Sequence, residues 1–253
     1  KDHKRLPGLL DEKDATDFEG RCTQALGVLK GAMKEEGKKS NPANEIESLP
    51  PLLAKRIALF GRCNLSPFCS FWGGIVAQEI VKHTGKFNPI RPWFYYENYS
   101  FVLPENDTLA REVQEKSRYR DQMAIIGTEA HKKLEQLKIF MVGAGALGCE
   151  YMKLFALMGI GCGTGKVEVT DDDNIEVSNL NRQFLFRREH VGSSKAQTAG
   201  KVAQIMNPHL NVVSYKNRVA PENENIFTDI FWDGVDFVVG AVEQSQSRHL
   251  RHC

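Results

Sequence analysis

A group of side chains with the chemistry of a phosphate site lies between residues 171 and 195. Its members are Asp171, Asp173, Asn179, Arg182, Gln183 and Lys195. Arginine and lysine neutralise phosphate groups, and fixed positive charge stabilises the charge that develops on a leaving pyrophosphate. Arg182 or Lys195 alone would be interpreted as a solvated surface charge. Together, in one turn-rich stretch, they favour a site that transfers a nucleotidyl group.

The elements that precede this group are those of a nucleotide-binding βαβ unit. An apolar strand at 139–142 leads into the glycine loop 143–148, and a helical pattern of apolar residues follows. A second strand, at 166–170, ends in Asp171. In this order the glycines let the backbone approach a phosphate, and the helix N-terminus offers unpaired N–H groups. An acid about 20 residues past the loop is placed to hold ribose hydroxyls.

The glycine loop alone would also fit an ordinary turn or a nicotinamide-dependent dehydrogenase. The agreement of strand, helix, second strand and acid argues against an ordinary turn. Hydride transfer has no need of the Asn, Arg, Gln and Lys side chains that follow Asp171. The dehydrogenase is therefore the weaker alternative.

Further segments of the sequence resemble the adenylating half of the ubiquitin-activating enzymes. They read GGIVAQEIVKHTGKF, VGAGALGCE, VTDDDNIEVSNLNRQFLFR, VGSSKAQTA and MNPHLNVVSYKNRVAPENENIF. NLNRQFLFR is far more specific than the glycine loop. Bacterial enzymes that adenylate sulfur-carrier proteins share this core. The implied fold class is α/β: a Rossmann-like, mainly parallel sheet flanked by helices, of the ThiF/MoeB adenylation type, preceded by a partial helical and α/β segment.

The resemblance implies a role for each residue of the group. ATP and Mg²⁺ would be the cofactors, and the C-terminal carboxylate of ubiquitin would attack ATP to give an adenylate and pyrophosphate. Arg182 and Lys195 are the implied catalytic residues, with Asp173 and Glu243 near the magnesium. The implied nucleotide contacts are Gly143, Gly145, Ala146, Gly148, Asp171, Asn179, Arg182, Gln183, Lys195, Glu243 and Gln244.

Glu243 and Gln244 follow a predicted fourth strand at 235–242, and they depart from the family pattern. The strand is nearly all apolar, which is typical of a strand buried on both faces. The family has Asp-Asn where this chain has Glu243-Gln244. Each side chain is one methylene longer, and because Mg²⁺ demands strict octahedral geometry, the longer reach is expected to lower activity.

The resemblance divides the chain into three parts. Residues 1–50 are interpreted as a helical segment and linker, residues 51–117 as the end of the inactive adenylation-like half with a linker, and residues 118–253 as a truncated active adenylation domain. Helices are predicted at 52–60, at 68–83 behind a Ser66-Pro67 start, up to Met206 behind a serine cap, and at 223–232. A strand is predicted at 92–96, and another at 211–215.

Composition indicates an ordinary soluble globular protein. The net charge of +1 gives no reason to expect nucleic acid or membrane binding. There is no C-x-x-C pair, and the charged N-terminus has no secretory core, so neither a zinc site nor disulfides are expected. A reducing compartment follows, the cytosol or the nucleus. The six cysteines are Cys22, Cys63, Cys69, Cys149, Cys162 and Cys253.

Two functions remain open. The first is ATP-dependent adenylation of ubiquitin or a ubiquitin-like protein. The second is a truncated or degenerate relative that binds nucleotide or a partner without turnover. The resemblance favours the second in one respect, since the family's catalytic-cysteine domain, its ubiquitin-fold domain and its ATP-completing arginine are absent here. A ubiquitin-conjugating enzyme would be recruited only through those absent domains. Cys149 and Cys162 are expected to be buried and inert.

Overall fold

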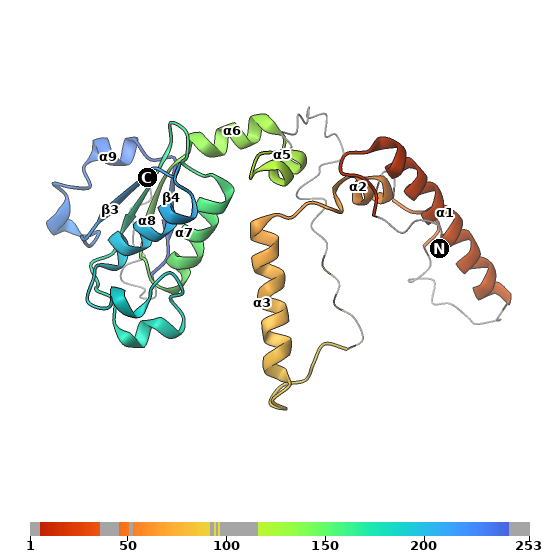
Figure 1. The fold of residues 1–253 in the computed structure, drawn as a ribbon, viewed down its shortest axis with the longest axis horizontal. Coiled ribbons are helices and arrows are strands. Elements are labelled where there is room, and N and C mark those ends of the chain that lie inside the picture. Colours follow the sequence, from red (N-terminus) through yellow and green to blue (C-terminus); the bar gives the residue numbers. More distant parts are fainter. Residues whose placement is uncertain are drawn as a thin grey trace. The chain divides into compact units, whose positions relative to one another are not determined.

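The computed structural model describes residues 6–35, 46–50, 53–91, 94, 96 and 116–242 (Figure 1). The described residues form two compact units. The first draws on residues 1–65 and 88–128, and the second on residues 66–87 and 129–253. This division concerns packing alone, so the family-based boundaries at 50 and 117 stay predictions.

The first unit is helical. It contains α1 (Glu12–Glu35), α2 (Leu53–Phe60) and α5 (Arg120–Ile126). A small core forms where Phe60 and Ile125 pack together with neighbouring apolar side chains. The helix predicted at 52–60 is confirmed by α2. Of the strand predicted at 92–96 the structure describes only Phe94 and Tyr96, and neither lies in a strand.

The second unit is built on a parallel sheet. Its strands are β1 (Lys138–Val142), β2 (Lys166–Thr170), β3 (Val212–Tyr215) and β4 (Phe237–Gly240). They run in the order β3-β2-β1-β4, and all three pairings are parallel. The strand order reverses beside β1, which lies between β2 and β4. Such a switch point opens a crevice at the carboxyl ends of the strands. The predicted α/β class with a parallel sheet is confirmed.

One face of the sheet packs against α7 (Ala146–Met158) and α8 (Lys195–Met206). Ile139 and Met141 of β1 point to this face, because alternate strand residues point to opposite sides. Ala196, Ala199 and Ala203 let α8 lie close to the strands, and all three are fully buried. The helix predicted to end at Met206 is confirmed, and Ser194 caps it by accepting from the Gln197 N–H.

Among the described residues, the opposite face of the sheet carries an aromatic cluster instead of long helices. Phe140 of β1 contacts Phe227, Phe231 and Trp232 edge-on or tilted, at centroid distances of 4.9–5.4 Å. The helix predicted at 223–232 is wrong. The chain forms a short 3-10 turn at Pro221–Asn223 and then α9 (Asp229–Asp233). The Thr228 hydroxyl caps the start of α9 by accepting the Phe231 N–H. A side chain that bonds to the backbone in this way competes with a continuous helix through the same position, so the predicted helix does not form across Thr228.

β4 is more exposed than its apolar sequence predicts. Phe237 and Val238 are 58% and 45% exposed. The expectation that this strand is buried on both faces is therefore wrong for its described residues. The reason is position, since β4 lies at one end of the sheet and only β1 pairs with it among the described strands.

A fully buried asparagine ties the helical layer together. The Asn207 amide donates to the Ala156 carbonyl at 2.8 Å and to Cys162 Sγ at 3.2 Å, and its oxygen accepts the His209 N–H. These contacts join the end of α8 to the end of α7. They hold the two helices that carry site residues at their N-termini in a fixed relation.

Two further helices complete the second unit. They are α3 (Ser66–Lys82), which confirms the helix predicted behind Ser66-Pro67, and α6 (Thr128–Gln136). In the part of the chain that the structure describes, no helix combines the length and the apolar character that crossing a membrane requires.

Candidate nucleotide-binding site

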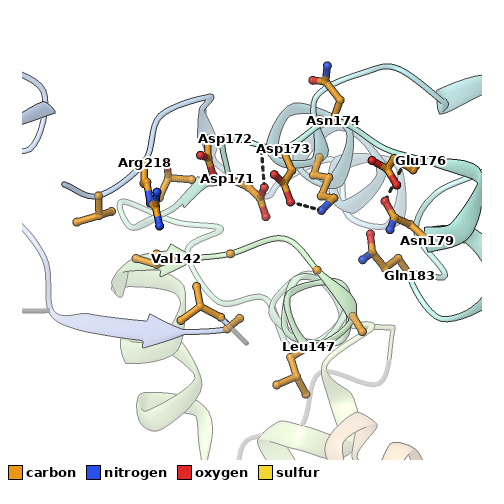
Figure 2. A pocket seen from close by; sticks show the side chains of 18 of the residues that line it. Val142, Leu147, Asp171, Asp172, Asp173, Asn174, Glu176, Asn179, Gln183 and Arg218 are labelled. Atoms are coloured by element: carbon orange, nitrogen blue, oxygen red, sulfur yellow. Dashed lines mark hydrogen bonds and ion pairs between the residues drawn. The ribbon is translucent and has the colours of Figure 1, made fainter. Parts of the chain in front are cut away.

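A cavity of about 660 Å³ opens at the carboxyl ends of the strands (Figure 2). Its volume is in the range of small-molecule sites. Most of its wall comes from the loops that follow β1, β2 and β3. The lining residues are Val142, Gly143, Gly145, Ala146, Leu147, Thr170, Asp171, Asp172, Asp173, Asn174, Glu176, Asn179, Arg182, Gln183, Lys195, Asn217, Arg218, Val219, Ala241 and Val242.

The three glycines of the loop serve different purposes. Gly143 has φ +100°, and a Cβ there would lie 2.6 Å from the Ala241 carbonyl oxygen. A Cβ on Gly148 would lie 2.3 Å from the Gly143 carbonyl oxygen. These two glycines let the loop fold on itself. Gly145 is different, because the nearest atom to its added Cβ is Gln183 Nε2 at 3.9 Å. The space above Gly145 belongs to the cavity.

The N-terminus of α7 faces this space. Gly145 is its N-cap and supplies no side-chain cap, so the first N–H groups of this 13-residue helix have no side-chain acceptor from that position. Ala146 and Leu147 of the first turn line the cavity. Free N–H groups and the positive end of a helix attract an anion.

Asp171 stands in the middle of the cavity wall. Its Oδ2 accepts the Ala144 N–H at 2.6 Å and its Oδ1 accepts the Asp173 N–H at 2.9 Å. Burial raises the pKa of the Asp171 carboxyl above its ordinary value, although these two N–H donors and Lys195 oppose the shift. The backbone bonds fix both oxygens, and their remaining lone pairs can accept hydroxyl protons.

Lys195 is the buried cation of the site. Its side chain is 10% exposed, and its Nζ lies 2.6 Å from Asp173 Oδ2. The backbone joins the same pair, since the Lys195 N–H donates to the Asp173 carbonyl at 3.1 Å. A bridge between Asn174 and Ser194 closes the neck of the intervening loop. The geometry therefore holds the ammonium of Lys195 beside Asp173, although the helix dipole disfavours a cation there.

The loop between these ends places three more predicted residues on the wall. Asn179 is buried, and its Oδ1 accepts the Glu176 N–H at 2.9 Å. Gln183 is 3% exposed, and its Oε1 is buried with no hydrogen-bond partner among the described residues. Arg182 is exposed and lies on its own loop, where Nη1 donates to the Ser178 carbonyl at 3.1 Å. A buried amide oxygen without a partner is uncommon, and the partner that it calls for is a hydrogen-bond donor.

The structure thus brings together most of the predicted site residues, in one cavity. Gly148 does not line it and instead lies beneath the loop. Glu243 and Gln244 lie outside the described residues. The sequence reasoning missed Asn217, Arg218 and Val219, which form a wall after β3. The rule that ligands bind at the carboxyl ends of all the strands would have indicated them.

The donor set of a divalent cation is present as well. Asp171, Asp172 and Asp173 each offer a carboxylate oxygen, and these oxygens lie within 4.8 Å of one another. Carboxylate oxygens suit Mg²⁺, so the residues present fit this ion. Asp173 shares its carboxylate with Lys195.

Cys149 is an unreactive thiol by its surroundings. It is fully buried, as predicted, and burial raises its pKa to about 11. Cys162 is only partly buried, so the expectation for that residue is wrong in degree. Cys63 is partly buried too, and burial raises its pKa to about 12.

We expect Cys149 to resist iodoacetamide in the folded protein. A raised pKa keeps the thiol protonated at neutral pH, so the thiolate fraction at pH 8 is only about a thousandth, against roughly a quarter for an ordinary thiol. Labelling should speed up as the pH rises toward 11. Peptide mass spectrometry would follow it, with exposed Cys69 as the internal control. Equal labelling rates of Cys69 and Cys149 at pH 8 would contradict the burial argument.

Known proteins resemble this chain in sequence. The family model described as the ThiF family matches residues 119–252. Ubiquitin-activating enzyme E1 2 of Arabidopsis thaliana is 45% identical over 206 residues, which is 80% of this chain and 19% of that protein. Ubiquitin-like modifier-activating enzyme 1 of Mus musculus is 38% identical over 250 residues, which is 97% of this chain and 23% of that protein. The chain spans about a fifth of the length of these curated relatives.

A solved structure shows a weaker likeness. The Escherichia coli tRNA N6-threonylcarbamoyladenosine dehydratase has a TM-score of 0.45 and 26% identity, and the match covers half of each chain. The family assignment rests instead on the matched residues and on the parallel sheet with its glycine loop. The chain belongs to the ThiF family, and it matches a portion of the ubiquitin-activating enzymes.

Proposed function

We propose that this chain binds ATP and serves the adenylation of ubiquitin or a ubiquitin-like protein. The observation that carries the proposal is the cavity itself. It combines an uncapped helix N-terminus, a fixed carboxylate at Asp171 and a buried ammonium at Lys195. The helix N-terminus and the ammonium suit phosphates, and the fixed carboxylate suits ribose hydroxyls, which are groups that a nucleoside triphosphate carries.

Each residue then has a chemical task. The Ala146 end of α7 binds a phosphate through backbone N–H groups. Asp171 accepts the ribose hydroxyl protons. Lys195 neutralises the charge that develops as pyrophosphate leaves, and because it is buried, that interaction is stronger than in water. The attacking group is the substrate protein's own C-terminal carboxylate, so no base from this chain is required.

Asp173 is the first candidate to hold magnesium, with the neighbouring Asp172 carboxylate in reach, and Glu243 is the second candidate. When bound, the ion neutralises phosphate oxygens. Gln183 has a task without the metal, because its Nε2 lies 3.9 Å from a Cβ built on Gly145 and can donate to a phosphate oxygen above the loop.

We expect ATP with Mg²⁺ to bind at least about tenfold more tightly than NAD. The reason is charge, because one extra charge-assisted hydrogen bond from Lys195 or Arg182 to a triphosphate contributes about 1.5–3 kcal/mol. Isothermal calorimetry of the folded chain with each ligand measures the difference. Tighter binding of NAD would contradict the proposal and favour a dehydrogenase.

Adenylation itself needs a second measurement. Ubiquitin-dependent exchange of pyrophosphate into ATP reports the adenylate directly. We expect exchange to depend on Lys195, since loss of one charge-stabilising donor costs about a hundredfold. ATP binding without any exchange would leave the non-catalytic relative as the function. We expect no ubiquitin thioester at Cys149 or Cys63, because a raised pKa keeps both thiols protonated at neutral pH. A non-reducing gel would show a thioester as a thiol-sensitive band. We place this activity in the cytosol or the nucleus.

A further inference from the structure

We propose that Arg218 is the base-binding residue of the site and holds a purine ring against its guanidinium plane. The inference rests on the proposed function and deepens it. Arg218 lines the cavity from the loop after β3, a segment to which the glycine-loop motif assigns no role.

The subsites lie in a row. In Figure 2 Arg218 lies at one end of the cavity, Gln183 and Asn179 lie at the other, and Asp171 lies between them. Gln183 borders the glycine loop, since its Nε2 lies 3.9 Å from a Cβ built on Gly145. The phosphates therefore occupy the Gln183 end. With the ribose at Asp171, the base must extend toward Arg218.

The Arg218 loop is held rigidly at this place. Thr170, the residue before Asp171, donates its hydroxyl to the Asn217 carbonyl. The Asn223 side chain donates to the Arg218 carbonyl at 2.8 Å, and its oxygen accepts from the Asn217 amide at 3.4 Å. The loop is thereby coupled to the strand that carries the ribose acid. A fixed backbone places the long side chain near the base at low entropic cost.

The guanidinium of Arg218 is available for a ligand. The side chain is exposed, and no ion pair or side-chain hydrogen bond engages it in the described part of the chain. Val219 and Val242 line the cavity too and supply apolar contact. A planar cation beside apolar side chains suits a flat, polarizable ring. A phosphate is better served by the N-terminus of α7, where Gly145 offers no side-chain cap to the first N–H groups of the helix.

The test separates the base from the phosphates. Calorimetry measures the affinity of the folded protein for ATP and for inorganic tripolyphosphate. We expect Arg218→Ala to weaken ATP binding about three- to tenfold and to leave tripolyphosphate binding unchanged. Arg218→Lys should resemble the alanine variant, because an ammonium keeps the charge and lacks the plane. The preference for ATP over CTP should shrink in both variants, since a purine offers the larger ring.

Lys216→Ala is the matched control. Lys216 is an exposed cation two residues earlier that does not line the cavity, so both affinities should stay at the wild-type value. Unchanged ATP affinity in Arg218→Ala would overturn the inference and leave the proposed function standing. Loss of tripolyphosphate affinity that lysine restores would overturn it too, by assigning Arg218 to the phosphates. If the wild-type protein fails to bind ATP, the proposed function itself fails.

Discussion

Replacing Gly148 with alanine should unfold the glycine loop and abolish nucleotide binding. The added Cβ would lie 2.3 Å from the Gly143 carbonyl oxygen and 3.0 Å from its carbon. Both are backbone atoms, so no side chain can turn aside to make room. We expect a loss of about 3 kcal/mol in the free energy of unfolding, although alanine ordinarily favours a helix. Chemical denaturation followed by circular dichroism measures it.

Gly145→Ala is the matched control for that experiment. Its Cβ meets nothing closer than Gln183 Nε2 at 3.9 Å, so the stability should change by less than about 1 kcal/mol. The methyl group nevertheless points to the space where a phosphate approaches. ATP affinity should therefore fall in both variants, and stability in Gly148→Ala alone. Equal stability of the two variants would show that the close approach of Gly148 to Gly143 is not essential.

Replacing Lys195 with methionine should weaken ATP binding by about 10- to 100-fold. The side chain keeps its length and its burial but loses a charge-assisted hydrogen bond to phosphate, which contributes about 1.5–3 kcal/mol. The fold should tolerate the change, because the partner carboxylate of Asp173 is 65% exposed and stays hydrated on its own. Calorimetry with ATP and Mg²⁺ measures the loss.

Lys201→Met removes an equal charge from the same helix. Lys201 is exposed and does not line the cavity, so ATP affinity should stay within about twofold of the wild-type value. If both variants lose affinity equally, the loss comes from the change in net charge, and Lys195 makes no specific contact with the phosphates. If neither does, the phosphates lie elsewhere in the cavity.

The strands were predictable where burial and sequence agree. β1 is apolar because both of its faces are covered, by the α7–α8 layer and by the aromatic cluster. The same run of apolar residues gave a wrong prediction for the burial of β4, because an apolar strand at the end of a sheet has the same sequence pattern as a central strand. The helix expected at 223–232 failed for a local reason, since the Thr228 cap competes with a continuous helix.

The site residues between the glycine loop and Lys195 could be predicted from the sequence. Asp171 and Lys195 are 24 positions apart, yet strand β2 and the closed loop neck bring them to one wall. Arg218 lies outside that segment, and finding it requires the rule that ligands bind at the carboxyl ends of all the strands, together with the pairing of β3 beside β2. The Lys195–Asp173 contact could not be predicted either, since a sequence does not show which acidic side chain a lysine contacts.

The pairing of β1 with β4 has a consequence for the order of folding. The Lys138 N–H donates to Asp236 across a separation of 98 residues, and Gly143 lies against the Ala241 carbonyl. Contacts this distant in sequence close late, because the chain must first lose the entropy of a long loop. During synthesis β4 also emerges last of the four strands. The glycine loop is therefore synthesised early, but its contact with the residues after β4 forms late. A nascent chain that lacks β4 does not have the complete cavity.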